Sequence, residues 1–130
     1  MIRRFSGWNW SGIATKTYKD EPGTWVGTSR RVFTDGAETA FEVRYFEMEP
    51  SGYTSFERHR HEHLVVVLRG RGRVRLGSEW HDLAPHDVVR VPADMPHRFE
   101  AGADEPFGIL CVVDRERDRP ELLDPATTEP

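Results

Sequence analysis

The chain has 130 residues, of which 22 are acidic and 18 are basic, so its formal net charge is −4. This length suits one domain with one hydrophobic core. The small negative charge gives no general attraction to nucleic acids or anionic membrane surfaces, so we expect neither as a partner.

The sequence also predicts the cellular compartment. Cys111 is the single cysteine, so no disulfide can form within the chain, and this composition fits a reducing compartment. The N-terminus lacks the apolar run of a signal peptide. No run approaches the ~20 apolar residues that a membrane span requires. We therefore expect a soluble, cytoplasmic protein.

Residues 1–24 show neither a helical period nor a strict strand period. They mix Phe5, Trp8, Trp10 and Tyr18 with glycines and polar residues. Aromatic side chains of this size favour burial. The segment is therefore expected to be an extended arm that packs on the outside of the domain or on a second subunit.

Residues 25–115 show short strands separated by turns at regular intervals, a pattern typical of an all-β sandwich or barrel. The expected strands are 25–33, 41–48, 53–56, 63–68, 73–76, 79–83, 87–91, 97–100 and 107–113. The expected turns between them are 35–36, 50–52, 69–70, 77–78, 92–94 and 102. No stretch predicts a long helix. The tail of residues 116–130 is charged and contains prolines, so we expect it to be partly disordered.

Residues 57–63 contain half of the six histidines. In an extended chain, residues two apart project from one face. This face would carry Glu57, His59, His61 and His63. Imidazole nitrogens and carboxylate oxygens suit divalent transition metals, which need donors from more than one element. His97, which begins an expected strand after a turn, is the predicted partner of this cluster.

Two stretches carry motif spacings. Residues 52–70 read GYTSFERHRHEHLVVVLRG, and residues 86–101 read HDVVRVPADMPHRFEA. The sequence here resembles the cupins, whose motifs are usually written G(X)5HXH(X)3,4E(X)6G and G(X)5PXG(X)2H(X)3N. The resemblance spans about residues 40 to 113. It implies an all-β fold, the double-stranded β-helix or jelly-roll barrel of cupins, over residues 25–115.

The motifs allow two ligand sets. Counting back seven positions from Gly70 puts the third ligand slot of the family on His63. The first set is Glu57, His59, His63 and His97. Matching HXH to the next pair instead, with a bulge, gives His59, His61, His63 and His97. We favour the first set because glycine turns fix hairpin register. His61 is then a neighbour of the metal ligands and a candidate for proton transfer.

The resemblance implies one divalent transition metal per chain, either Mn, Fe, Ni, Co, Cu or Zn. It also implies an enzyme of dioxygenase, isomerase or lyase type that acts on a small organic molecule. Two alternatives stay open: a non-catalytic module that binds a small molecule or a metal, and a metal-free cupin that uses acid–base chemistry like an epimerase. A homodimer is expected, since cupins often pair through their sheets and N-terminal arms.

Several further residues bear on the pocket. Candidates for its walls are Tyr45, Phe46, Met48, Phe56 and Phe99. An inward Arg44 would suit a carboxylate, whereas Cys111 is expected in the core. His86 and Asp94 stand where the second motif has glycine, so a left-handed backbone is expected at both. His81 and His86 are expected to be structural or exposed.

Overall fold

The computed structural model describes residues 1–19 and 24–126. The expected disorder at the very end of the tail falls on residues 127–130, which lie outside the described residues. The strands are β1 Phe5–Ser6, β2 Asn9–Trp10, β3 Lys16–Thr17, β4 Val26–Val32, β5 Phe41–Tyr53, β6 Glu57–Arg58, β7 His63–Arg69, β8 Gly72–Leu76, β9 Glu79–Leu83, β10 Val88–Val91, β11 His97–Ala101, β12 Phe107–Asp114 and β13 Glu121–Leu122. Over the part of the chain that the structure describes, no helix is long and apolar enough to cross a membrane.

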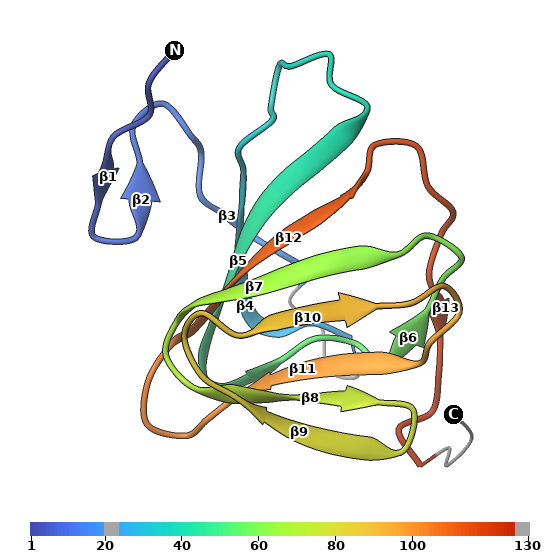
Figure 1. Ribbon diagram of the computed structural model, residues 1–130. Helices are drawn as coiled ribbons and strands as arrows, with labels where there is room; N and C mark the ends of the chain where they lie inside the picture. The colour runs from blue at the N-terminus through green and yellow to red at the C-terminus, as the bar shows by residue number, and fades with distance from the viewer. Residues whose placement is uncertain (20–23, 127–130) are drawn as a thin grey trace.

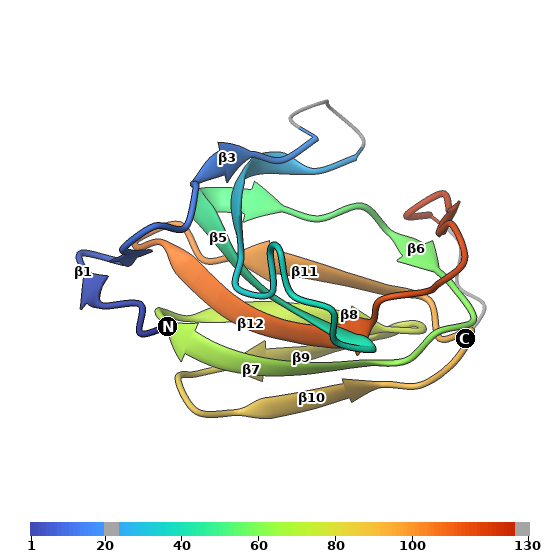
Figure 2. The same ribbon diagram turned by 90° about the horizontal axis from the view of Figure 1, so that it is seen from above.

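Strands β3 to β13 form one antiparallel sheet that curls on itself, and β1 and β2 form a separate two-stranded sheet (Figures 1 and 2). The hydrogen-bonded order is β10-β7-β12-β5-β11-β6-β13. In addition, β4 pairs with β5 and with β3, while β8 pairs with β11 and with β9. The long strand β5 joins the two layers, because its first part pairs with β12 and its last residue, Tyr53, pairs with β11. This architecture confirms the predicted all-β jelly roll.

One expected turn lies inside this strand. Residues 50–52 continue β5 instead of ending it, and Ser51 has a φ of 65° there. The opposite strand shifts register between Val26 and Thr28, so the extra residues of β5 form a bulge. A bulge bends a strand without ending its pairing, which lets β5 pass from one layer to the other.

The core lies between the two layers. Alternation along β7 and β12 sends Val65, Val67, Ile109 and Val113 inward, each at most 3% exposed. They pack with Met48, Val74, Val91, Phe99 and Phe107. Strands with inward-facing β-branched and aromatic residues bury one face of the sheet efficiently, which explains why the apolar pattern alone predicted most strand positions.

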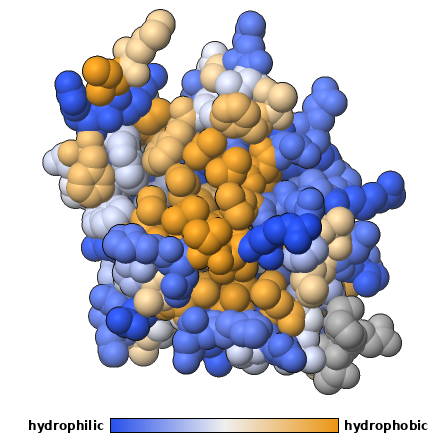
Figure 3. All heavy atoms as spheres, in the orientation of Figure 1, coloured by the Kyte–Doolittle hydropathy of each residue, from blue (hydrophilic) through white to orange (hydrophobic). Residues whose placement is uncertain are grey.

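The opposite face of the same strands is also apolar. Figure 3 shows a hydrophobic area over the layer that contains β7, β10 and β12. Leu64 and Val88 are 43% and 60% exposed. We call this surface the outer apolar face; it consists of Val43, Leu64, Val66, Leu68, Val88, Leu110 and Val112. An antiparallel sheet that faces water on one side normally carries polar residues there, so this face has the composition of a covered surface.

The N-terminal arm packs on the outside of the barrel. Strands β1 and β2 form a hairpin, and Trp8 stacks on Tyr45 with ring centroids 5.7 Å apart. Trp10 contacts Phe33 edge-on at 4.7 Å. Tyr45 therefore faces the arm. Residues 20–23 of the expected arm lie outside the described residues.

Left-handed backbone occurs at both positions where the second motif loses its glycines. His86 has a φ of 79° and Asp94 a φ of 61°. The Asp94 N–H donates to the carbonyl of His59 at 2.7 Å, so this turn fastens the histidine loop. His81 and His86 are exposed, as expected.

Candidate metal centre

The histidine-rich segment is not one extended strand. Strand β6 ends at Arg58, the chain bends at residues 60–61, and β7 begins at His63. The segment still brings its donors together, because Glu57 pairs with His97 across β6 and β11, while His63 pairs with Val91 across β7 and β10. The glycine and proline turns that set these pairings hold the two motifs against each other.

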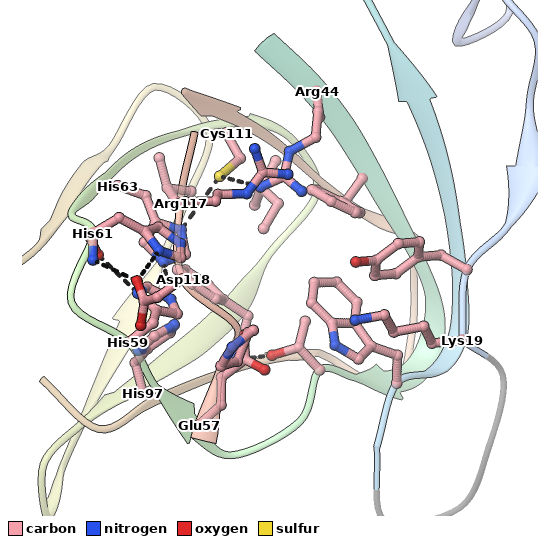
Figure 4. Close-up of a pocket in the computed structure, with 18 residues that line it drawn as sticks. Lys19, Arg44, Glu57, His59, His61, His63, His97, Cys111, Arg117 and Asp118 are labelled. Carbon is pink, nitrogen blue, oxygen red and sulfur yellow. Dashed lines mark hydrogen bonds and ion pairs between the residues drawn. The ribbon is translucent and has the colours of Figure 1, made fainter. Parts of the chain in front are cut away.

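His59, His63 and His97 form a compact group (Figure 4). One ligand atom from each lies within 4.8 Å of the others. The His59 and His63 Nε2 atoms are 2.6 Å apart, and the His97 ring lies 4.8 Å and 4.9 Å from the other two rings, centroid to centroid. These three residues are the ones that both ligand sets from the sequence have in common.

Backbone carbonyls orient two of the rings. His59 Nδ1 lies 2.7 Å from the carbonyl oxygen of His61, and His97 Nδ1 lies 2.8 Å from that of Met95. Because a carbonyl oxygen can only accept, each Nδ1 carries the proton and each neutral ring leaves a lone pair on Nε2. This is the arrangement in which histidine binds a metal through Nε2 while its other nitrogen is held in place.

Burial keeps the group uncharged. Desolvation is the main cause that lowers the pKa of His59, of His63 and of His97, the last to about 4. The neighbouring histidines lower them further, since each would repel a second charge. Neutral imidazoles with free lone pairs at pH 7 are the form that binds a divalent metal, so the residues present fit such an ion.

Glu57 and His61 lie on two sides of this group without joining it. Glu57 is 7% exposed and accepts a 2.7 Å hydrogen bond from the Ser55 hydroxyl, and burial raises the pKa of its carboxyl. His61 stacks on His59 with ring centroids 3.7 Å apart. The two ligand sets differ in the fourth metal ligand, which is Glu57 in one and His61 in the other, and this ligand stays a prediction.

Asp118 is a site residue that the sequence did not indicate. It accepts hydrogen bonds from the backbone N–H of Arg60 and of His61, and its carboxylate lies 2.9 Å from His61 Nδ1. The Arg60 N–H and then the His61 ring hold the pKa of Asp118 well below its usual range. Strand β13, which pairs with β6, fastens the tail here. Part of the tail thus forms one side of the site.

A cavity of about 150 Å³ opens in front of the histidines. Of the expected wall residues, Phe46 and Phe99 line it, whereas Tyr45, Met48 and Phe56 do not. Tyr45 faces the arm, because adjacent residues of a strand point to opposite faces of the sheet. The complete lining is Tyr18, Lys19, Trp25, Arg44, Phe46, Thr54, Glu57, His59, His61, His63, Val65, His97, Phe99, Ile109, Cys111, Arg117, Asp118 and Pro120.

Cys111 is buried, as expected, and it also faces the cavity. Its Sγ lies 3.3 Å from His63 Nδ1 and accepts a 3.6 Å hydrogen bond from Arg44 Nη2. Burial raises the pKa of the thiol, and the Arg44 charge opposes this shift. The cavity therefore combines three neutral imidazoles with the single thiol of the chain.

Comparison with known proteins identifies the family of the chain. The family model described as a cupin domain matches residues 44–113. A curated relative from Rhodospirillum rubrum is 40% identical over 118 residues, which cover 90% of this chain and 76% of that protein. It is named 1-methylthio-D-xylulose 5-phosphate methylsulfurylase.

Two solved structures are similar over nearly the whole chain. A cupin-2 domain from Rhodospirillum rubrum is 38% identical with a TM-score of 0.85, and the match covers 97% of this chain and 85% of that one. A cupin 2 conserved barrel domain protein from Rhodopseudomonas palustris is 35% identical with a TM-score of 0.88, covering 96% and 88%. Together with the family match, these similarities show that the chain belongs to the cupin family, as a small protein with a cupin-2 domain.

Proposed function

We propose that the protein is a metal-dependent cupin enzyme that cleaves a carbon–sulfur bond in a small, phosphorylated sugar carrying an alkylthio group. The observation that carries this proposal is the meeting of the histidine group and the Cys111 thiol in one cavity, with Sγ 3.3 Å from His63 Nδ1. The name of the relative that is 40% identical over 90% of this chain supports the substrate class.

In this proposal His59, His63 and His97 would hold the metal through their Nε2 atoms, because carbonyl oxygens occupy Nδ1 of His59 and of His97 and Nε2 of His63 faces Nε2 of His59. A divalent ion there would supply Lewis acidity toward a carbonyl or hydroxyl oxygen of the substrate. Glu57, which lines the same cavity, is the proposed carboxylate ligand. His61, whose Nδ1 lies 2.9 Å from the Asp118 carboxylate, is the proposed group that moves a proton at the edge of the site.

Cys111 is the proposed acceptor of the alkylthio group. Its sulfur, as a thiolate, attacks the sulfur of the substrate; an S–S bond forms and the C–S bond breaks. The electron pair of the broken bond stays on the carbon, next to the ketone, as an enolate that is then protonated. A small-molecule thiol next attacks the methyl-bearing sulfur, which releases a mixed disulfide and restores Cys111. With Nε2 occupied by a metal, His63 Nδ1–H can donate to the sulfur and stabilise the thiolate.

Turnover of 1-methylthio-D-xylulose 5-phosphate by metal-loaded protein tests this function. With a small-molecule thiol in excess, we expect the S-methyl signal of the substrate to disappear by NMR. Without the thiol, intact-mass spectrometry is expected to show one CH3S group added to the protein. In the Cys111→Ser variant the S-methyl signal of the substrate should persist, because the rate falls by about 100-fold or more, and no CH3S adduct should form, whereas the metal should be retained. A loaded wild type that neither turns over nor gains the adduct contradicts this reaction.

The proposed assembly is a homodimer in which a second copy covers the outer apolar face. Burying this face removes apolar side chains such as Leu64 and Val88 from water in both copies. Light scattering is expected to give twice the mass of one chain for the wild type and one mass for Leu64→Lys. His81→Lys, on the exposed surface of β9, is the matched control and should stay dimeric. A monomeric wild type would rule out the assembly.

A further inference from the structure

Arg44 is a buried cation that lacks the nearby carboxylate found beside two other arginines whose Nε is buried. Three arginines, Arg31, Arg44 and Arg98, have a buried Nε without a hydrogen-bond acceptor. Arg31 lies 3.9 Å from a Glu47 carboxylate oxygen, and Arg98 lies 3.4 Å from one of Glu100. Among residues 1–19 and 24–126, no carboxylate lies within 4.0 Å of the Arg44 guanidinium.

This unpaired charge is expensive for the protein to bury. Arg44 is only 7% exposed. A guanidinium cannot lose its proton at any ordinary pH, so burial cannot neutralise it as it can a lysine or histidine. Its described contacts are weak ones, a 3.6 Å hydrogen bond to the Cys111 sulfur and a cation–π contact with Phe46 at 4.9 Å. Several N–H donors are left for a group that is not part of the chain.

The position of Arg44 explains where that group would lie. Arg44 on β5 is the direct cross-strand partner of Cys111 on β12, so both side chains project from the same face of the sheet into the cavity (Figure 4). Lys19 and Arg117 also line this cavity. Arg117 is already engaged, because its Nη1 lies 2.7 Å from Glu42 Oε2. Arg44 therefore remains the buried cation of the cavity without a carboxylate among the described residues.

We propose that Arg44 binds the phosphate group of the ligand in this cavity. Its planar guanidinium offers paired N–H donors that match the oxygens of a phosphate, and a buried site strengthens such charge-assisted hydrogen bonds. The identity of the ligand rests on the proposed function, whereas the presence of an anion site rests on Arg44 itself. Arg44 is thus a specificity-determining residue that separates phosphorylated sugars from their uncharged counterparts.

Calorimetric titration of metal-loaded protein tests this role without requiring turnover. The probes are D-xylulose 5-phosphate, the uncharged D-xylulose, the sugar acid D-xylonate, and inorganic phosphate. We expect the wild type to bind the phosphate ester at least about 30-fold more tightly than D-xylulose, the ratio typical of one buried charge-assisted pair. Arg44→Met should reduce this ratio to about 3-fold or less, with the affinity for D-xylulose unchanged. Arg44→Lys keeps the charge without the planar fork and should fall between them.

Arg31→Met is the matched control, since Arg31 is equally buried but lies outside the cavity beside Glu47. It should keep the wild-type preference, and metal content and thermal unfolding confirm that each variant folds. If Arg44→Met does not fold, the test rests on Arg44→Lys, whose preference for the phosphate ester over D-xylulose should be lower than that of the wild type. Three outcomes overturn the proposal. The preference for the phosphate ester over D-xylulose could be unchanged in both Arg44 variants, or it could be lost in Arg117→Met instead. The third is an Arg44-dependent preference for D-xylonate over the phosphate ester.

The same titrations separate this proposal from the proposed function. Arg44-dependent binding of inorganic phosphate, without binding of the sugar phosphate, supports the anion site and contradicts the substrate class. Turnover of the alkylthio sugar phosphate with equal KM in the wild type and in Arg44→Met supports the function and overturns the role of Arg44.

Discussion

Replacing His97 by alanine is expected to reduce metal binding by about 100-fold or more, so that the purified variant carries no stoichiometric metal. His97 is 2% exposed and its Nδ1 is fixed by the carbonyl of Met95, so no other side chain can take over its position. The measurement is elemental analysis of protein purified without chelator, repeated after reconstitution with each first-row divalent ion. About one equivalent is expected in the wild type.

The same measurement decides the fourth ligand. Glu57→Ala and His61→Ala remove the two candidates that lie beside the histidine group, and the loss of metal in one of them identifies the set that operates. His81→Ala is the matched control, because His81 is exposed on β9 and does not line the cavity. Iron or copper in the wild type would favour oxygen chemistry, whereas zinc would favour lyase or isomerase chemistry.

Two results would contradict the metal centre. Full metal occupancy in His97→Ala would show that the ion binds elsewhere. A wild type that takes up no metal even after reconstitution would leave the neutral histidines and Glu57 as an acid–base or pure binding site.

Metal-free protein is expected to lose stability as the pH falls from 7 to 4. Burial lowers the pKa of His97 from 6.5 to about 4 in the folded protein. Between these values the unfolded chain binds a proton at this histidine and the folded protein does not, so falling pH favours unfolding. For His97 alone the loss in the free energy of unfolding reaches about 3 kcal/mol at pH 4, and it is complete below that pH.

Comparison with His97→Gln isolates this contribution. Glu57 acts in the opposite direction, because burial raises the pKa of its carboxyl and its protonation stabilises the folded protein as the pH falls. Chemical denaturation at pH 7 and pH 4 should therefore show a pH dependence that is about 3 kcal/mol smaller in His97→Gln than in the wild type. His81→Gln should follow the wild type. Equal pH dependence in His97→Gln and the wild type would show that the folded protein protonates His97 as readily as the unfolded chain.

The sequence alone determined the strands and the shared ligands. The apolar run of residues 64–68 predicted strand β7, and Gly70 and Gly77 take the left-handed backbone that ends β7 and β8. Because turn positions fix the pairing of antiparallel strands, spacing along the chain was enough to bring His97 to the histidine segment. The local apolar pattern and the turn residues therefore predicted most of the fold and three of the site residues, His59, His63 and His97.

Tertiary structure alone decided what surrounds them. Asp118 lies 57 positions from His61 in the chain, and a charged, proline-containing tail gives no local sign of where it docks. Arg44 and Cys111 face the cavity, whereas Tyr45 faces the arm, because the pairing of β5 with β12 and the packing of Trp8 set which side of β5 points inward. A strand's period separates its two faces but does not say which of them meets the core; only contacts between segments distant in the chain choose between them.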